Sequence, residues 1–529
     1  MKKTIIYSIL VVVLTAGFTS CDDWFDLRPK SDTTLEDFWN DEKDVRSMVG
    51  ACYRAMNEFG FIDRLMVWGE IRSDNVMKGL AAGEERSRDV TRILDLTLNS
   101  ANPYTSWTEF YRVINYCNTV IRFAPAVLEK DPNFTEKQLN AYLAEVKGLR
   151  ALCYFILVRT FRDIPFSTEP YVDDTKAFNL PQSNPDEVIR FLIDDLKAVE
   201  EGATVGFLDL ASDKGRITRK AIWCLIADMS LWLGEYKDCI TYCDKVLQLQ
   251  TTSMEHRIEL EKAPSEYYSR IFVRGNSSES LFELQFDPSL VTGNTSVHSM
   301  YSVGEYNGFP QNYRSLDSGN EKVASFDFVN KIPLFREADL RSKDFYVQIE
   351  SGGRFPIVKY VGERDTRMEK PMADAYWSIP LRSWIFYRLP EVFLMKAEAL
   401  VESGGDLTEA LGCVSRTYDR ANPDLGENSL GERSREEMRE LVFEERQREF
   451  LFEGKRYFDL LRRVKRENST ANILSLLIRK YEADKMNANT VRGKISDIDA
   501  LYMPINENEL KVNPLLKQNP FYISTSVIK

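Results

Sequence analysis

Along the first half of the chain, hydrophobic residues recur every three or four positions, which is the spacing of one buried face of an α-helix. The segment 44–60 carries Val45, Met48 and Val49 at this spacing. Pro165 is expected to end the long helix before it, because proline cannot continue a helix. The segments with this pattern predict four helical hairpins, 44–60 with 106–122, 136–161 with 186–200, 217–233 with 236–249, and 385–402 with 407–420.

The third of these hairpins has a recognisable pattern. Trp223 and Ile226 precede Gly234, Tyr236 and Cys239. These offsets resemble the tetratricopeptide repeat, a helical hairpin with a large residue early, glycine at the turn and a small residue in the second helix. Such a hairpin leaves an apolar face that only a neighbouring hairpin covers. We therefore expect a mostly α-helical, tetratricopeptide-like scaffold of about four hairpins.

The segment 251–380 has a different composition. It is rich in Tyr, Phe, Gly, Asn and Ser, has few helical patterns, and contains short alternating pieces such as SLFELQF and FPIVKYV. We expect a loop-rich layer with small β-strands that lies on the helical scaffold. Because binding residues gather on loops held by a rigid framework, this layer is the expected place of ligand binding.

The chain begins like an exported protein. Two lysines are followed by about ten mostly apolar residues, which is typical of a secretory signal and too short to span a bilayer. Cys21 follows at the expected exit and is the predicted lipidation site; the alternative is simple secretion with an unmodified thiol. The expected parts are a signal peptide 1–20, a lipidated tether 21–43, an N-terminal helical-repeat part 44–250, a loop-rich ligand-binding part 251–380, and a C-terminal helical part 381–529.

Charge and metal-type residues exclude some classes of function. The formal net charge is −12, whereas a nucleic-acid-binding protein needs a basic face. Cys239 and Cys243 stand four apart on one helix face, as two zinc ligands would. Zinc needs two further ligands, and the chain has only two histidines. We therefore expect these cysteines to be small buried residues between packed helices.

Several long segments together resemble the SusD/RagB family of surface nutrient-binding lipoproteins. Two departures from the family pattern are Arg162, where glycine is usual, and Arg463, where tryptophan is frequent. The segments that carry the resemblance, in chain order, are LEDFWNDEKDVRSMVGACYRAM, WGEIRSDNV, GLRALCYFILVRTFRDIPF, YRLPEVFLMKAEAL and ERQREFLFEGKRYFDLLRR.

The resemblance implies a non-catalytic receptor without a cofactor. It would sit on the outer membrane, facing the cell exterior, anchored by a lipid on Cys21, with Asp22, Asp23 and Asp26 as part of the signal for surface display. Its implied partner is a SusC-like TonB-dependent transporter, to which it would deliver oligosaccharide. Several acyl chains on one cysteine would make this anchoring stable.

Candidate ligand residues lie in the loop-rich part. Receptors for sugars stack aromatic rings on C–H patches and add amide or carboxylate hydrogen bonds. The alternative is that these rings only pack the loop layer. The loop after Asp74 is charged and poor in aromatic residues, which leaves acidic or decorated glycans, and peptides, open as ligands. The candidate residues are Tyr301, Tyr306, Asn307, Phe309, Tyr313 and Trp377.

Two other classes of function compete with this reading. A glycosidase needs two carboxylates at a defined separation, and Glu445, Glu449 and Glu453 are candidates. We instead expect a charged helix that packs on the scaffold, begins with a capping box of Ser434 and Glu437, and pairs residues three apart on its own flank, Arg446 with Glu449 and Glu453 with Arg456. The second competitor is a helical-repeat scaffold that binds only proteins, against which the aromatic-rich segment argues.

Overall fold

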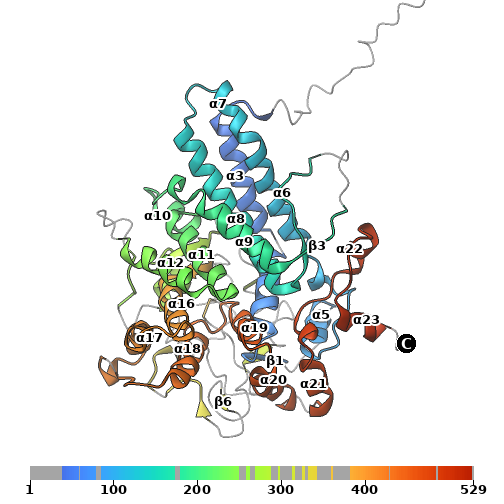
Figure 1. Cartoon of the computed structure of the whole chain (residues 1–529), viewed down its shortest axis with the longest axis vertical. Coiled ribbons are helices and arrows are strands. Elements are labelled where there is room, and N and C mark those ends of the chain that lie inside the picture. Colours follow the sequence, from blue (N-terminus) through green and yellow to red (C-terminus); the bar gives the residue numbers. More distant parts are fainter. Residues whose placement is uncertain are drawn as a thin grey trace, which may run out of the picture.

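The computed structural model describes most of the chain (Figure 1). The described residues are 38–526 except 59, 79–84, 173–178, 250–257, 263–267, 287–295, 298–312, 316–324, 328–331, 337, 342–358, 361–381, 428 and 484–485. Within them, no helix is long and apolar enough to cross a membrane.

The four predicted hairpins are all present. In each, the two helices pack against one another, and α6 with α8 and α12 with α16 pack between hairpins, so that they form a continuous stack (Figure 1). The hairpins are α3 (Glu42–Met56) with α6 (Thr108–Phe123), α8 (Glu136–Phe161) with α9 (Pro185–Lys197), α11 (Arg219–Leu233) with α12 (Tyr236–Gln248), and α16 (Leu389–Glu402) with α17 (Leu407–Ala421).

In the third hairpin, the residues of the tetratricopeptide-like pattern have identifiable structural roles. Gly234 ends α11 in the left-handed region, at φ +77°, where glycine has no steric penalty. Cys239 on α12 is fully buried, and its Sγ lies 3.8 Å from the carbonyl oxygen of Met395 on α16. A small side chain at this position lets the next hairpin approach closely. The mostly α-helical, tetratricopeptide-like fold class is confirmed.

The end of α8 differs from the prediction. The helix ends at Phe161, four residues before Pro165. Arg162 adopts φ +68° and ψ −79°, and the Asp163 amide donates to the Phe161 carbonyl at 3.0 Å. This is a γ-turn of the rare type with positive φ, which is strained for any residue other than glycine. An ion pair from Arg162 to Asp499, at 2.5 Å, holds the turn in place.

Small antiparallel strand pairs lie beside the helices. They are β1 (Val76–Lys78) with β5 (Tyr313–Ser315), β2 (Ile164–Pro165) with β3 (Gln182–Ser183), β4 (Ser280–Leu284) with β8 (Trp384–Arg388), and β6 (Ser325–Asp327) with β7 (Ile332–Pro333).

The prediction that helix 385–402 begins at residue 385 is wrong. Residues 384–388 pair with β4, and the helix starts only at Leu389, with Pro390 in its first turn.

The remaining helices are shorter or lie outside the four hairpins. Those after residue 430 are α18 (Arg435–Glu449), α19 (Arg456–Glu467), α20 (Ala471–Ala483), α21 (Ala488–Ile495), η12 (Ile498–Leu501), α22 (Glu507–Val512) and α23 (Pro520–Ser526). The others are α4 (Phe61–Met66), the π-helix η3 (Val67–Ile71), α5 (Glu85–Leu94), η4 (Pro103–Thr105), η5 (Ala124–Ala126), α7 (Val127–Lys130), η6 (Glu200–Gly202), α10 (Leu210–Gly215), the π-helix η8 (Ser269–Arg274) and η11 (Pro423–Leu425).

The π-helix η3 contacts the turn between α18 and α19 at backbone distance. A Cβ atom on Gly69 would lie 1.8 Å from the carbonyl oxygen of Gly454, so only glycine fits there. Beside it, the buried Glu70 carboxylate accepts hydrogen bonds from the amides of Phe452 and Gly454 and from Asn75 Nδ2, at 2.8–3.1 Å. The N-terminal and C-terminal parts of the chain are therefore joined through one carboxylate.

Candidate functional site

Most of the predicted ligand residues lie outside the described residues. These are Tyr301, Tyr306, Asn307, Phe309 and Trp377, and Cys21 lies outside them as well. The backbone of Tyr313 is described: it belongs to β5 and is paired with Lys78 of β1. The assignment of ligand residues therefore stays a prediction.

The segment that leads into β1, the strand paired with β5, is held by buried polar contacts. Asp74 forms a two-pronged ion pair with Arg456 of α19, at 2.8 and 2.9 Å. Gln447 of α18 donates to the Asn75 side chain at 2.7 Å. The Ser-Asp segment that carries part of the family resemblance thus fixes β1 to two C-terminal helices, and its carboxylate is fully engaged in doing so.

Glu445, Glu449 and Glu453 form the centre of a buried ion-pair network. Glu449 contacts three guanidinium groups, Arg388 at 2.6 Å, Arg420 at 2.5 Å and Arg341 at 3.0 Å. Glu453 is paired with Arg388 and Lys359, each at 2.6 Å, and Glu445 with Arg341 and Arg448, at 2.8 and 2.9 Å. All three carboxylates have an exposed fraction of 2% or less.

The predicted pairing along the flank of α18 is wrong. Arg446 binds Asp459 of α19 at 2.9 Å rather than Glu449, and Arg456 binds Asp74 rather than Glu453. Both arginines are buried and reach outward from their helix to partners elsewhere in the chain. The capping box of Ser434 with Glu437, in contrast, is confirmed.

The electrostatics of this network do not favour acid catalysis. Burial alone would raise the pKa of Glu449, but Arg420, Arg388 and Arg341 together hold it well below its ordinary value. Burial lowers the pKa of Lys359 to about 8, against the opposing effect of Glu453. A general acid in glycoside hydrolysis needs a raised pKa and access to the substrate. Glu449 has neither, so its role is structural.

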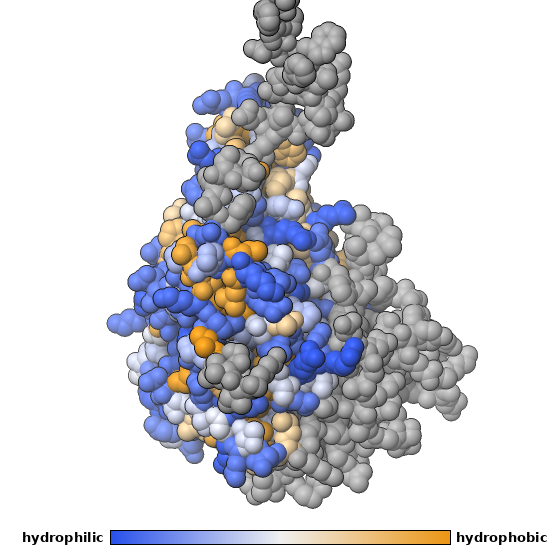
Figure 2. Space-filling view, turned by 90° about the vertical axis from the view of Figure 1, so that its right-hand side faces the viewer, coloured by the Kyte–Doolittle hydropathy of each residue, from blue (hydrophilic) through white to orange (hydrophobic). Residues whose placement is uncertain are grey.

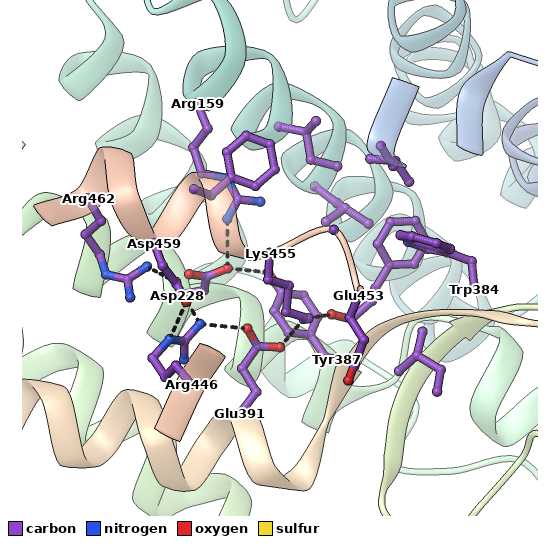
Figure 3. Close-up of a pocket in the computed structure, with 17 residues that line it drawn as sticks. Arg159, Asp228, Trp384, Tyr387, Glu391, Arg446, Glu453, Lys455, Asp459 and Arg462 are labelled. Carbon is purple, nitrogen blue, oxygen red and sulfur yellow. Dashed lines mark hydrogen bonds and ion pairs between the residues drawn. The ribbon is translucent and has the colours of Figure 1, made fainter. Parts of the chain in front are cut away.

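A small polar cavity lies beside this network (Figure 3). Its volume is about 40 Å³, enough for a few water molecules but not for a sugar ring. Lys455 and Arg446 point toward Glu391, and Arg159 points toward Asp228 (Figure 3). Two buried guanidinium nitrogens at this cavity, Arg446 Nη1 and Arg159 Nε, have no hydrogen-bond partner among the described residues. We expect ordered water there.

A much larger cavity lies on the opposite side of α8. It is bounded by α6, residues 165–171, residues 179–180 and the residues of and after α22, and its volume is about 860 Å³. None of the ligand residues predicted from the sequence lies there. The sequence did contain a signal for this cavity on α6, because one face of the helix carries Trp107, Tyr111, Asn115 and Asn118. Amides are unusual on a face that only packs against other helices, so their presence there was the informative feature.

The seven cysteines of the described residues are buried and unbridged. Cys239 and Cys243 lie in α12 between packed helices. No group of three or more His, Cys, Asp or Glu side chains suited to a metal ion occurs within the described ranges.

The known proteins to which this chain is similar are SusD-like proteins. A family model described as the SusD family matches residues 356–522. The SusD-like protein P38 of Formosa agariphila is 23% identical over 98% of this chain and 99% of that protein. The starch-binding protein SusD of Bacteroides thetaiotaomicron is 23% identical over 87% of this chain and 90% of its own length.

The fold agrees with these sequence relationships. The structure of the surface glycan-binding protein A from Bacteroides uniformis covers 90% of this chain and 99% of its own, with a TM-score of 0.69 at 21% identity. The matched C-terminal segment contains α16 to α22, with the buried network of α18 and α19 at its centre. The sequence segments, the family match over residues 356–522, these relatives and the fold all support similarity to the SusD/RagB-like family.

Proposed function

We propose that this protein is a non-catalytic glycan receptor, anchored to the outer face of the outer membrane through a lipid on Cys21. It holds an oligosaccharide and delivers it to a SusC-like TonB-dependent transporter. The observation that carries this proposal is the similarity over nearly the whole chain to SusD-like proteins, of which one is by name a starch-binding protein and another a surface glycan-binding protein.

Two features of the described residues support a receptor rather than a hydrolase. The three clustered glutamates of the α18 region are buried and each contacts at least one cation at 2.9 Å or less. The cavity beside them, of about 40 Å³, has no room for a sugar. Neither a free pair of carboxylates nor a substrate-sized space exists at this network, which is where the sequence offered candidate catalytic acids.

The ligand residues of this proposal remain those of the loop-rich part 251–380. Tyr301, Tyr306, Phe309 and Trp377 would provide rings for stacking on the sugar, and Asn307 an amide for its hydroxyl groups. Tyr313 belongs to the same set, and its backbone is fixed on β1 through β5. The helical parts 44–250 and 381–529 would act as the scaffold that holds these loops.

The test is direct binding by the full chain, purified in detergent. It would be titrated calorimetrically against neutral glucans, host-type and acidic glycans, and mixed oligopeptides. Saturable glycan binding that is weakened in Tyr306→Ala and Trp377→Ala supports the proposal. Leu208→Ala is the control, because it removes a side chain that is 91% exposed on the helical scaffold and should leave binding unchanged.

Three outcomes would contradict parts of the proposal. Binding of oligopeptides alone would retain the family but replace the ligand. New reducing ends released from a bound glycan would show catalysis. Failure of the chain to co-purify with the TonB-dependent barrel produced from the same cells would argue against delivery to that transporter.

A further inference from the structure

A small cavity lies where the segment before β1 meets the C-terminal helices. Its volume is about 50 Å³, which is room for a few water-sized particles. The described residues that line it come from the end of η3, the end of α5, and α19, α20, α21, η12 and α23. Three of these elements, α5, α21 and α23, lie toward the right-hand side of Figure 1. Figure 2 shows that side of the molecule, where hydrophilic residues surround smaller hydrophobic groups, so its described surface is mostly solvated.

Arg72, which follows η3, brings a buried positive charge to this cavity. Its Nη2 donates to the Leu501 carbonyl at 2.6 Å, and its guanidinium carbon lies 4.2 Å from the centre of the Tyr457 ring. Its Nη1 is buried and has no hydrogen-bond partner among the described residues. A carbonyl oxygen and a ring face carry only partial negative charge. Most of the charge of this guanidinium is therefore unbalanced.

The other buried arginines show that this situation is an exception in the chain. Every other arginine that is buried in the described part lies within 3.3 Å of a carboxylate oxygen. The fold thus supplies a counter-charge wherever it buries a guanidinium, because a buried charge without one is costly. Arg72 has the same physical requirement, and no carboxylate of the described residues meets it.

A second cation lines the same cavity. Lys494, in the last turn of α21, is half-buried, and its Nζ donates to the Leu96 carbonyl at 2.7 Å. No Asp or Glu occurs among the described residues that line the cavity. Because like charges repel, two cations at one small cavity favour a negatively charged occupant. Lys494 is the more exposed of the two cations, so it lies nearer to solvent than Arg72 does.

The size and the walls of the cavity narrow the class of anion. The described walls include the apolar side chains of Ile93, Leu477 and Ile495. A sulfate or phosphate dianion would lose much of its hydration beside such walls, and two side chains offer too few donors to replace it. A sugar or a larger organic acid does not fit in about 50 Å³. Water fits, but it leaves both positive charges unbalanced. A small monovalent anion satisfies both the size and the charge.

We propose that this cavity binds a small monovalent anion, chloride in the natural environment, between Arg72 and Lys494. The anion joins the segment before β1 to α21 and η12, which are more than four hundred positions away in the sequence. It is a structural ligand that binds the folded chain and so stabilises it by mass action. The proposal is separate from the predicted ligand loops and from the proposed receptor function.

The first test replaces chloride by bromide, which is similar in size and has an anomalous X-ray signal. Crystals of the full chain in sodium bromide should show an anomalous peak inside the cavity, in contact with Arg72 or Lys494. Crystals of Arg72→Met under the same conditions should show no such peak. A cavity that holds only water in the unaltered chain would overturn the proposal, and so would a peak that persists in Arg72→Met.

The second test measures melting temperature in potassium chloride and in potassium gluconate at equal ionic strength. Gluconate is too large for the cavity. Comparing the difference between the two salts across variants cancels general salt effects. With chloride tenfold above its dissociation constant, binding should add about 1 °C to the Tm of the unaltered chain and nothing to that of Arg72→Met. Arg92→Met is the matched control, because it removes a positive charge from α5 at a side chain that is 51% exposed and outside the cavity lining.

Lys494→Met keeps the test decisive if Arg72→Met does not fold. It replaces a half-buried side chain and should reduce the chloride-dependent part of Tm, whereas Arg92→Met should retain it. The same chloride-dependent part in Lys494→Met and in the unaltered chain would contradict the site. A bromide peak without any chloride-dependent change in Tm would mean an adventitious ion only. Because glycan binding enters none of these measurements, this inference and the proposed function can fail independently.

Discussion

Replacing Glu449 by glutamine would test how far the buried ion-pair network determines stability. The substitution keeps the shape of the side chain but removes the negative charge that faces Arg388, Arg420 and Arg341 at 2.5–3.0 Å. Glu453 and Glu279 also contact Arg388, yet three guanidinium groups would then share less negative charge in a largely buried region. The fully buried charges make this a severe perturbation.

The magnitude follows from the cost of an unbalanced buried charge. Removing one partner of a buried ion pair typically costs about 3–5 kcal/mol of unfolding free energy. Unfolding entropy of about 2.1 cal/mol/K per residue gives about 1.1 kcal/mol/K for the 529 residues. If the body unfolds as one unit, Tm should therefore fall by about 3–5 °C.

Differential scanning calorimetry at pH 7 measures this shift, and Glu444→Gln is the matched control. Glu444 lies on the same helix, is 31% exposed and contacts Arg448 only at 3.5 Å, so its loss should cost less than about 1 kcal/mol. Because the pKa of Glu449 is held below its ordinary value, its stabilising effect is present above pH of about 4.3 and is lost on acidification. The variant should thus converge with the unaltered chain in acid. Equal Tm values for Glu449→Gln and Glu444→Gln at pH 7 would refute the reasoning.

Three other substitutions test local features of the fold. Burial raises the pKa of Glu70 to about 7, so the stabilisation by its neutral form is complete below pH of about 4.3 and is lost as the pH rises through 7; the Tm advantage of the unaltered chain over Glu70→Gln should shrink by about 2 °C between pH 5 and 8, and a constant gap contradicts this. Arg162→Gly should melt about 1–2 °C above Arg162→Ala, since both lose the same ion pair but only glycine relieves the positive φ; equal melting would show that the turn is not strained. Gly69→Ala should yield no soluble folded chain because its Cβ meets the Gly454 backbone, whereas Gly50→Ala on α3 meets nothing within 4 Å and should be slightly stabilised; comparable soluble yields of the two would be inconsistent with the close approach.

The helical scaffold was predictable because its signal is local. The spacing of hydrophobic residues within one segment indicates the buried face of one helix. Gly234 likewise marks the turn after α11 independently of the rest of the chain. The start of α16 was misplaced for the opposite reason. Residues 385–388 were predicted as the start of a helix, but β4, about a hundred positions earlier, pairs with residues 384–388 and makes them a strand.

Charged partners were not predictable from spacing. Arg446 and Glu449 stand three apart, and on an exposed helix they would pair. Here α18 is buried on several faces and Arg446 reaches Asp459 of α19 instead, although Arg448 and Glu445, which are also three apart, do pair. The candidate ligand rings Tyr306 and Trp377 were chosen by composition and remain predictions. The cavity at Tyr171 and Glu509 was missed because three distant segments build it and none has a ligand signature of its own.

The buried charges explain how parts of the chain that are distant in sequence are held in one arrangement. The α18–α19 region binds Asp74 and Glu70 from the N-terminal part, Arg341, Lys359 and Arg388 from the loop-rich part and its edge, and Arg420 from the last hairpin. Buried ion pairs contribute little net stability compared with well-packed apolar residues, but a misplaced partner is costly. They therefore penalise any other arrangement of these parts more than they strengthen this one.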